Sequence, residues 1–209
     1  MFARNRHARR YILRVLPDGG ARVTIPRGGS VEQGLAFARR NAGWIEKELK
    51  RTPPQWRDGM QLLFRGVPVR LGLSDGEAGR KVSVAGVEIE LSPGVGLREA
   101  VEARFKMIAI AELPVRVLEL ALQHGLEVRC VQVRDQRSRW GSCSARKTIS
   151  LNWRLVQTPE FVRDYIIVHE LMHLKEMNHS EGFWRHVEAA CPIYMEAERW
   201  LRRNSRLLR

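Results

Sequence analysis

Three histidines and a glutamate near the end of the sequence have the types and spacing of a metal site. In the run His169-Glu170-Leu171-Met172-His173, the two histidines would lie about 40° apart on one face of a helix. Neutral imidazole is a good zinc ligand. Glu170 would lie about 100° round from His169, where it can take a proton from a zinc-activated water without binding the ion. The motif therefore predicts a zinc-dependent hydrolase with Glu170 as general base.

A third metal ligand is expected shortly after this helix, because catalytic zinc sites usually have three protein ligands and an open fourth position. The first candidate is His179. On a continuous helix it would face about 240° away from His173. We therefore expect the helix to break near Met177-Asn178, with Asn178 in a left-handed conformation. Other candidates for the third ligand are Glu181, His186 and Glu188.

Two simpler interpretations compete with a catalytic site. The histidines could be an ordinary pair on a helix, but the apolar run Tyr165 to Val168 predicts that this helix is buried, where unpaired His and Glu would be costly. The chain could instead be a binding module with a structural zinc, which would not need Glu170. Asp164, Glu176 and Asn152 are candidates to orient the imidazoles through their second ring nitrogens. Tyr165 could assist them or belong to the core.

The elements that must position these residues occupy the second half of the chain. A helix is expected from Leu97 to about His124, capped near Gly125 and kinked or split at Pro114. The metal-binding helix would begin with Thr158 as N-cap and Pro159 as its first residue. Three short strands and a last helix complete this half, over residues 127–134, 139–143, 148–153 and 193–201.

The first half has the alternation and turn residues of β-hairpins. Residues 11–16 and 21–25 predict a hairpin around the turn Pro17 to Gly20, and residues 60–92 predict two more, 62–64 with 69–73 and 82–84 with 87–91. A capping box of Ser30 and Gln33 opens a helix that should reach Leu49 before Thr52-Pro53-Pro54. We expect this helix to bury Leu35, Ala38, Ala42 and Ile45. The predicted fold class is α+β, with a β-rich region with one helix over 1–93 and a metal-binding domain over 94–209.

Charge and cysteine usage limit the partners and the compartment. The 209 residues include 36 Lys and Arg against 23 Asp and Glu, a net charge of +13, which favours nucleic acid, nucleotides or acidic substrates. Cys130, Cys143 and Cys191 form no Cys-x-x-Cys pair, so no disulfide framework is expected and the cytoplasm is the predicted location. No apolar run reaches the roughly 18 residues of a membrane span, and no secretory segment is evident.

Several motifs together resemble the YgjP-like metallopeptidases, which are similar to the SprT and WLM zinc proteases. The motifs are the runs 136–143, 149–155, 169–173, 178–180 and 183–184, with the first hairpin and the Trp44-Ile45 helix. The resemblance implies a compact zincin-like domain of a long helix, a small sheet, the metal helix and a C-terminal helix. It also implies zinc on His169, His173 and His179, with Glu170 as general base. The metzincin signature fits less well, because Glu176 replaces its glycine and Met195 lies in a helical stretch.

The segment before the metal helix supplies the candidate substrate-binding residues. In zincins an edge strand commonly binds an extended peptide, and either 139–143 or 148–153 could be that strand. Arg137 and Arg139 could bind a carboxylate or phosphate, and Trp140 could line the site. The alternative is structural, with Trp140, Trp153 and Trp184 in one core cluster. Cys143 is expected to be a small buried residue and not a nucleophile.

These observations favour a zinc metallopeptidase that acts on polypeptides. The same chemistry could cleave a phosphoanhydride, so hydrolysis of a nucleotide is the second hypothesis. The third is a protease associated with nucleic acid through its basic N-terminal half. The sequence does not predict the oligomeric state.

Overall fold

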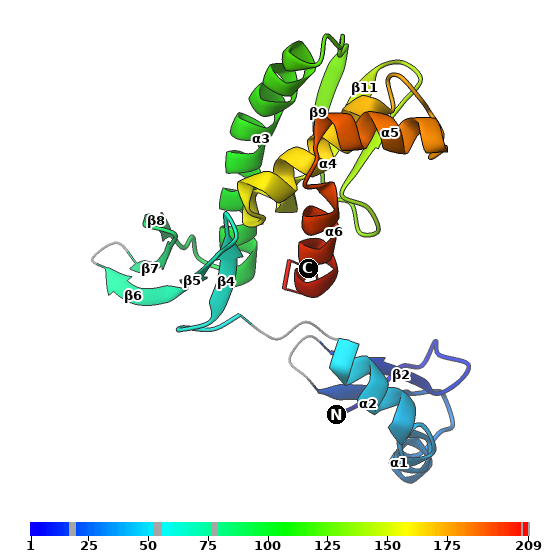
Figure 1. Ribbon diagram of the computed structural model, residues 1–209. Coiled ribbons are helices and arrows are strands. Elements are labelled where there is room, and N and C mark those ends of the chain that lie inside the picture. Colours follow the sequence, from blue (N-terminus) through cyan, green and yellow to red (C-terminus); the bar gives the residue numbers. More distant parts are fainter. Residues whose placement is uncertain (17–19, 52–55, 77–78, 206, 209) are drawn as a thin grey trace. The chain divides into compact units, whose positions relative to one another are not determined.

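The computed structural model of the chain describes residues 1–16, 20–51, 56–76, 79–205 and 207–208 (Figure 1). Contacts divide the chain into two compact units, Met1–Trp56 and Arg57–Arg209. Both units combine helices with small sheets, so the predicted α+β class is confirmed. The expected turn residues Pro17 to Gly19 and the expected helix stop at Thr52 to Pro54 lie outside the described residues. No helix in the described ranges is long and apolar enough to cross a membrane.

The N-terminal unit is a three-stranded sheet with two helices. Its strands lie in the order β1-β3-β2, and its elements are β1 (Phe2–Arg4), β2 (Ile12–Val15), β3 (Ala21–Ile25), α1 (Val31–Arg40) and α2 (Ala42–Arg51). The predicted hairpin is confirmed by the antiparallel pairing of β2 with β3. The capping box is also present, because the Gln33 N–H donates to Ser30 Oγ at 3.1 Å and the Ser30 N–H donates to Gln33 Oε1 at 3.2 Å.

The single helix expected after Ser30 is two helices in the structure. Asn41 separates them, and its Nδ2 donates to the Phe37 carbonyl at 2.8 Å. The predicted burial of Leu35 and Ala42 is wrong, since Leu35 is 41% exposed and Ala42 is also exposed. The residue of α1 that is buried is Gly34, where an added Cβ would lie 3.3 Å from the Phe2 ring. The absence of a side chain there lets the helix approach the sheet.

The second unit begins with two antiparallel sheets. The first contains β4 (Gln61–Phe64) and β5 (Val67–Arg70), and the second contains β6 (Gly72–Gly76), β7 (Gly79–Val84) and β8 (Val87–Glu90) in that order. The pairs Leu62 with Val69 and Val82 with Ile89 confirm the two predicted hairpins, but the partner strand of the first ends at Arg70, and residues 72–73 belong to β6, which pairs with β7. The hairpin of β4 and β5 turns through Arg65 and Gly66, both at positive φ, as in a two-residue type I′ turn.

The hairpin of β4 and β5 packs against the second half of the chain. The Arg65 and Gly66 N–H groups donate to the carbonyls of residues 156 and 157 at 3.0 and 2.9 Å. Gln157 Nε2 returns a bond to the Leu63 carbonyl at 3.1 Å. The predicted domain boundary after residue 93 therefore does not coincide with the division between compact units, and as a boundary between functional domains it stays a prediction.

A long helix, α3 (Leu97–Gln123), supports the unit (Figure 1). It remains one element through Pro114, so the expected split into two helices does not occur. Its end is the predicted glycine cap: Gly125 has φ of 63°, and the Leu126 N–H donates to the Ala121 carbonyl at 2.8 Å. The buried face repeats every four residues and includes Val101, Phe105, Ala109, Leu113 and Val117.

A mixed sheet follows, in the order β10-β11-β9. Its strands are β9 (Cys130–Arg134), β10 (Gly141–Cys143) and β11 (Thr148–Asn152), with β11 parallel to β9 and antiparallel to β10. The central position of β11 is explained by its side chains, since Ile149 and Leu151 are fully buried. A short 3-10 helix, η1 (Trp153–Gln157), leads from this sheet into the helix of the motif.

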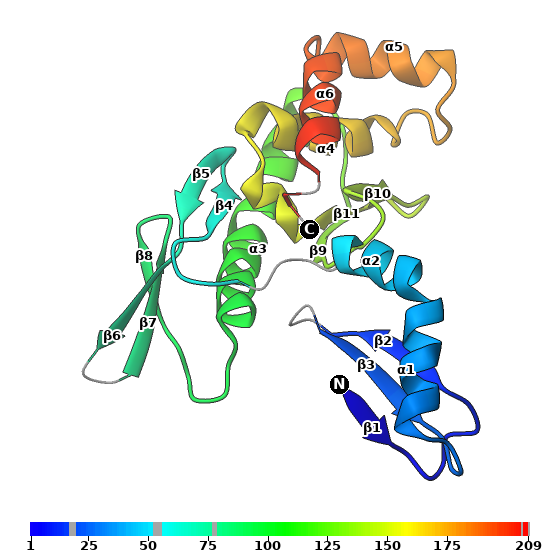
Figure 2. The ribbon, with the colours of Figure 1, turned by 90° about the horizontal axis from the view of Figure 1, so that it is seen from below.

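The helix of the motif is α4 (Glu160–Met172), followed by α5 (Glu181–Ala190) and α6 (Tyr194–Asn204) (Figure 2). The predicted N-cap, Thr158, is wrong. Its hydroxyl donates to the Leu155 carbonyl at 2.8 Å at the end of η1, and Pro159 is the N-cap. A half-buried ion pair joins α4 to α3: Arg116 NH2 lies 2.6 Å from Asp164 Oδ2, and Arg116 Nε lies 3.1 Å from Oδ1. This two-point pair fixes the orientation of α4 on the long helix.

Candidate metal centre

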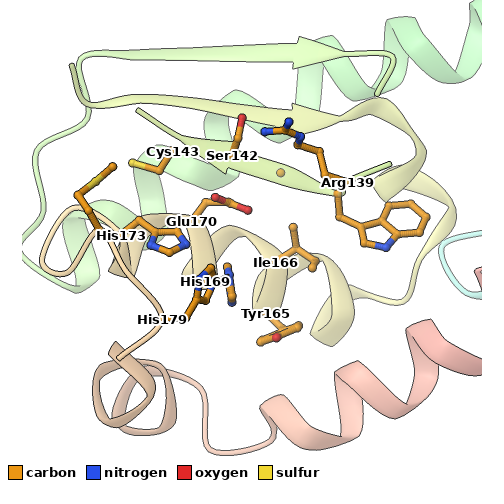
Figure 3. A pocket seen from close by; sticks show the side chains of 12 residues that line it. Arg139, Ser142, Cys143, Tyr165, Ile166, His169, Glu170, His173 and His179 are labelled. Atoms are coloured by element: carbon orange, nitrogen blue, oxygen red, sulfur yellow. Dashed lines mark hydrogen bonds between the residues drawn. The ribbon is translucent and has the colours of Figure 1, made fainter. Parts of the chain in front are cut away.

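The three imidazoles predicted to bind metal converge at the end of α4 (Figure 3). His169 lies in the last turn of α4, His173 is its C-cap, and His179 lies on the returning chain. Nε2 of His169 and Nε2 of His179 are 3.2 Å apart. The possible ligand atoms of all three residues lie within 4.8 Å of one another. This spacing allows one ion to bind all three.

The chain reverses after His173 by a route that differs from the expected one. The helix ends at Met172, and the Leu174 and Glu176 N–H groups close a turn with the carbonyls of Leu171 and Met172. Asn178 is not among the described residues with positive φ, so the predicted left-handed conformation is wrong. Its side chain instead accepts the Ser180 N–H at 2.9 Å, which is an Asx-turn that directs His179 back toward α4.

Burial favours the neutral form of two of these imidazoles, those of His169 and His173. Burial, with smaller effects from His173 and His179, lowers the pKa of His169 to about 4. Burial also lowers the pKa of His173, although a contact of its Nδ1 with the Glu176 carbonyl, at 3.1 Å, acts in the opposite direction. The Nδ1 of His169 is buried without a hydrogen-bond partner among the described residues. A neutral ring has a free lone pair, which is the form that binds a metal.

A fully buried aromatic ring holds the imidazoles together. The centroid of Phe183 lies 4.4 Å from that of His173, 4.9 Å from that of His169 and 4.8 Å from that of His179. The ring stacks on His173 at 23° and meets the other two edge-on. Because Phe183 contacts every member of the histidine cluster, it restricts their rotation before any metal binds.

Glu170 occupies a tight position between α4 and β10. Only 6% of its surface is exposed. Burial raises the pKa of its carboxyl to about 7, against a smaller lowering effect of Arg139. A Cβ added to Gly141 would lie 2.6 Å from both Cγ and Oε1 of Glu170, closer than such atoms approach in proteins. Gly141 therefore provides the space for this carboxylate.

A cavity of about 480 Å³ opens over the three histidines and Glu170 (Figure 3). Its other walls include residues 139–143, so the predicted residues Arg139 and Trp140 do line it. Arg137 is exposed and is not among the residues that line this cavity, so its role in binding substrate stays a prediction. Since β10 pairs only with β11, it is the edge strand beside the cavity, and the alternative, residues 148–153, is the central strand.

The remaining candidates have other places in the structure. Glu181, His186 and Glu188 are exposed and lie outside the metal-binding group of the described residues. Asp164 binds arginines, and Asn152 Nδ2 donates to the carbonyls of Gln136 and Arg139, which holds the loop before β10. Neither residue orients an imidazole; Glu176 does so through its backbone.

Among the described residues, Trp140, Trp153 and Trp184 make no ring contacts with one another, so the alternative of a single core cluster is not what the structure shows. Trp153 is buried with the Arg154 guanidinium 4.4 Å from its ring centroid, Trp140 lines the cavity, and Trp184 packs 5.9 Å from His169. Burial raises the pKa of the Cys143 thiol to about 11, as expected for a residue that is not a nucleophile. Met195 is 55% exposed and contributes nothing to the cluster.

Three features of the site were not predicted from the sequence. These are the contact of Gly141 with Glu170, the ring of Phe183, and the bond from the Tyr165 hydroxyl to Glu198 Oε1 at 2.9 Å. Tyr165 in turn meets His169 edge-on, with 5.9 Å between the ring centroids. Phe183 belongs to the run 183–184 that carries the family resemblance, but nothing in the sequence indicated its contacts with the imidazoles, and Glu198 had no signal.

Comparisons with known proteins find one matching family and two similar solved structures. Two solved metallopeptidase zymogens are similar to the chain: abylysin of Pyrococcus abyssi, at 26% identity, and jannalysin of Methanocaldococcus jannaschii, at 24%. Each match covers 44% of this chain, and 93% or 95% of the zymogen, with TM-scores of 0.40 and 0.38. A search of curated proteins finds no match. The YgjP-like, metallopeptidase domain family matches residues 9–204, nearly the whole sequence, so the chain belongs to the YgjP-like metallopeptidase family.

Proposed function

We propose that this protein is a zinc-dependent peptidase with Glu170 as its general base. The observation that carries the proposal is the convergence of three imidazoles, from His169, His173 and His179, beside a buried carboxylate. Three nitrogen ligands on an open cavity fit a catalytic zinc better than a structural one, which would have four protein ligands. Zinc bound there would supply an activated water and polarise the carbonyl to be cleaved.

Glu170 is suited to move the proton. It follows His169 directly on α4, so it lies at the metal-binding group without belonging to it. Its carboxylate is confined by Gly141 on β10 and cannot swing freely. We assign it the role of accepting the proton of the attacking water and delivering it to the leaving amine.

The edge strand β10 is suited to bind an extended polypeptide. The Asn152 N–H donates to the Trp140 carbonyl at 2.8 Å, and the Ser144 N–H donates to the Thr148 carbonyl at 3.0 Å. By the alternation of an antiparallel pair, the backbone groups of Gly141 and Cys143 point away from β11. A substrate chain could add to this edge in register with the metal-binding group. Arg139 and Trp140 would then contact side chains of that substrate.

Arg139 also favours a second candidate substrate. It is an exposed arginine that lines the cavity and acts electrostatically on Glu170. A guanidinium in this place could bind the phosphates of a nucleotide. A nucleoside triphosphate is therefore the alternative substrate, whose phosphoanhydride bond would be cleaved by the same activated water.

The first experiment compares metal content and hydrolysis of an unfolded protein for the wild type and Glu170→Gln. The variant keeps all three histidines, so zinc should stay near one ion per chain, while activity should fall by about 10² to 10⁴-fold. Glu181→Gln is the matched control, because it removes an exposed carboxylate that was a candidate ligand. It should change neither quantity.

Each alternative gives a different result in this experiment. A wild type with zinc that hydrolyses nucleoside triphosphates but no polypeptide would replace the peptidase by the nucleotide hydrolase. Full activity of Glu170→Gln would refute the assigned base. A purified protein that binds no zinc, even after the metal is supplied, would refute the proposal as a whole.

A further inference from the structure

The net charge of the protein is concentrated in its N-terminal unit. Residues 1–56 contain 12 Lys and Arg against 4 Asp and Glu, which leaves +8 of the total of +13. The other 153 residues contain 24 against 19, which leaves +5. A unit of this size with so high a charge attracts polyanions strongly.

This unit also has an aromatic groove of about 820 Å³ between β2 and the two helices. Its aromatic side chains are Tyr11, Phe37 and Trp44. Trp44 is 45% exposed, which is unusual for so large an apolar ring. The two views place α2 beside β2 within the unit (Figures 1 and 2).

Hydrogen bonds fix the floor of this groove. The Tyr11 hydroxyl donates to Gln33 Oε1 at 2.7 Å and accepts the Ser30 N–H at 3.0 Å, so its ring is tied to the capping box of α1. The Tyr11 and Phe37 rings pack with 5.9 Å between centroids. A rigid aromatic floor loses little conformational entropy when a ligand stacks on it.

Two arginines flank the rings. Arg10 and Arg14 line the groove and are exposed. Neither forms an ion pair with any residue that the structure describes, so their charges are available to a ligand. Stacking surfaces beside unpaired arginines are the combination by which proteins bind unpaired bases and the phosphates that join them.

We propose that this groove binds single-stranded nucleic acid, with bases on Trp44 and the neighbouring rings and phosphates on Arg10 and Arg14. The inference goes beyond the proposed peptidase function and does not depend on it. It gives the protein a second site, formed entirely within the N-terminal unit, that could hold it on DNA or RNA.

The test measures fluorescence anisotropy of labelled oligothymidylate and oligouridylate of about 12 nucleotides with the full-length protein. Each is titrated between about 50 and 200 mM salt, and the same length of duplex serves as competitor. Arg10→Ser/Arg14→Ser is compared with Arg39→Ser/Arg40→Ser, which removes the same charge from exposed positions of α1 outside the groove. Trp44→Ala and Trp44→Phe test stacking, and circular dichroism verifies the fold of every variant.

The groove should account for most of the affinity. The groove pair should lose about tenfold or more in affinity and reduce the salt slope by about 1.4, at 0.7 for each phosphate contact. The control pair should lose less than about threefold. Trp44→Ala should lose about tenfold, and Trp44→Phe should recover most of it, because any aromatic face can stack. Preference for thymidylate or uridylate would identify the polymer as DNA or RNA.

Four outcomes would overturn the inference. The first is no oligonucleotide binding by the wild type at low salt. The second is an equal loss for the groove pair and the control pair, which would mean diffuse attraction without a site. The third is unchanged binding by Trp44→Ala. The fourth is evidence that the groove binds a different partner. Polyglutamate could bind as tightly as the oligonucleotide and lose the same affinity in Trp44→Ala. Alternatively, the variants could change the oligomeric state without any change in oligonucleotide binding.

Discussion

The two units of the chain use charged and aromatic residues in opposite ways. In the second unit, carboxylates and arginines are paired across elements, as in Arg116 with Asp164 and Arg154 with Asp135, and aromatic rings pack on the histidine cluster. In the N-terminal unit, Arg10 and Arg14 are exposed without ion pairs among the described residues, and Trp44 is 45% exposed. The difference indicates a unit organised around internal chemistry and a unit organised for contact with another molecule.

The largest expected effect is that of metal removal, which should abolish peptide hydrolysis and leave oligonucleotide binding unchanged. Treatment with a chelator, or His173→Ala, should reduce zinc affinity by at least about 100-fold and reduce peptide hydrolysis to background. Oligonucleotide affinity should not change, because the groove lies in the other unit. Zinc analysis, hydrolysis and anisotropy on one preparation check this. A parallel loss of oligonucleotide binding would show that the two units depend on one metal.

A glycine in each unit provides the next comparison. Gly141→Ala should displace the Glu170 carboxylate and lower hydrolysis by about 10²-fold while zinc stays near one per chain. Gly43→Ala, in α2, meets nothing within 4 Å and should leave hydrolysis unchanged while stabilising the unit by about 0.5–1 kcal/mol. Kinetics and thermal unfolding of both variants check this. Normal activity of Gly141→Ala would mean that the Glu170 carboxylate can keep a productive position beside the added methyl group.

The contribution of ion pairs to the stability of the second unit can be tested by comparing a half-buried pair with an exposed pair. Asp164→Asn leaves Arg116 half-buried with a weaker partner and should lower the free energy of unfolding by about 2 kcal/mol, between the values for exposed and buried pairs. Glu127→Gln breaks the pair with Lys147 at an exposed position and should leave the free energy of unfolding unchanged within the error of the measurement. Urea unfolding measures both. Equal changes in the free energy of unfolding for the two variants would contradict the expectation that the half-buried ion pair contributes more than the exposed one.

The smallest effect is a dependence on pH. Burial raises the pKa of Asp135, but hydrogen bonds from Arg154 and Lys106 outweigh it and lower the pKa to about 2. A lowered folded-state pKa stabilises the protein above the unfolded value of about 4, and this contribution disappears as the pH falls through about 2. Since the carboxylate is 47% exposed, Asp135→Asn should cost less than about 1 kcal/mol at pH 7, and this cost should shrink as the pH falls from about 4 and vanish only below about pH 2. A cost that did not depend on pH would point to packing instead.

Local patterns in the sequence predicted most of the elements and the three histidines that converge in the structure. The hairpins, the capping box of Ser30 and the cap at Gly125 depend on neighbouring residues and are present as expected. The exposure of Leu35 was not predicted. An amphipathic pattern identifies the apolar face of a helix, but it does not say which residues of that face contact the sheet. The outward position of Arg137 depends on the loop before β10, which the distant Asn152 holds.

The order of the strands and the contact between Gly141 and Glu170 could not be predicted from the sequence, for a different reason. Residues 139–143 and 148–153 have similar strand-forming character, and only the parallel pairing of β11 with β9 makes β10 the edge. The space that Gly141 leaves becomes visible only when α4 is packed against that edge. These are relations between segments, and neither segment alone encodes them.

The Ser180 cap has a thermodynamic consequence for the proposed metal site. Ser180 Oγ accepts the Phe183 N–H at 3.2 Å, so one short turn starts α5 and also places His179 and Phe183 on the imidazole cluster. The ordering of α5 and the affinity for the ion are therefore linked, and each stabilises the other by the same free energy. Metal occupancy should be recorded in the amide hydrogen exchange of the first turn of α5, far along the chain from His169. That turn is thus a reporter of the ion even when no substrate is being cleaved.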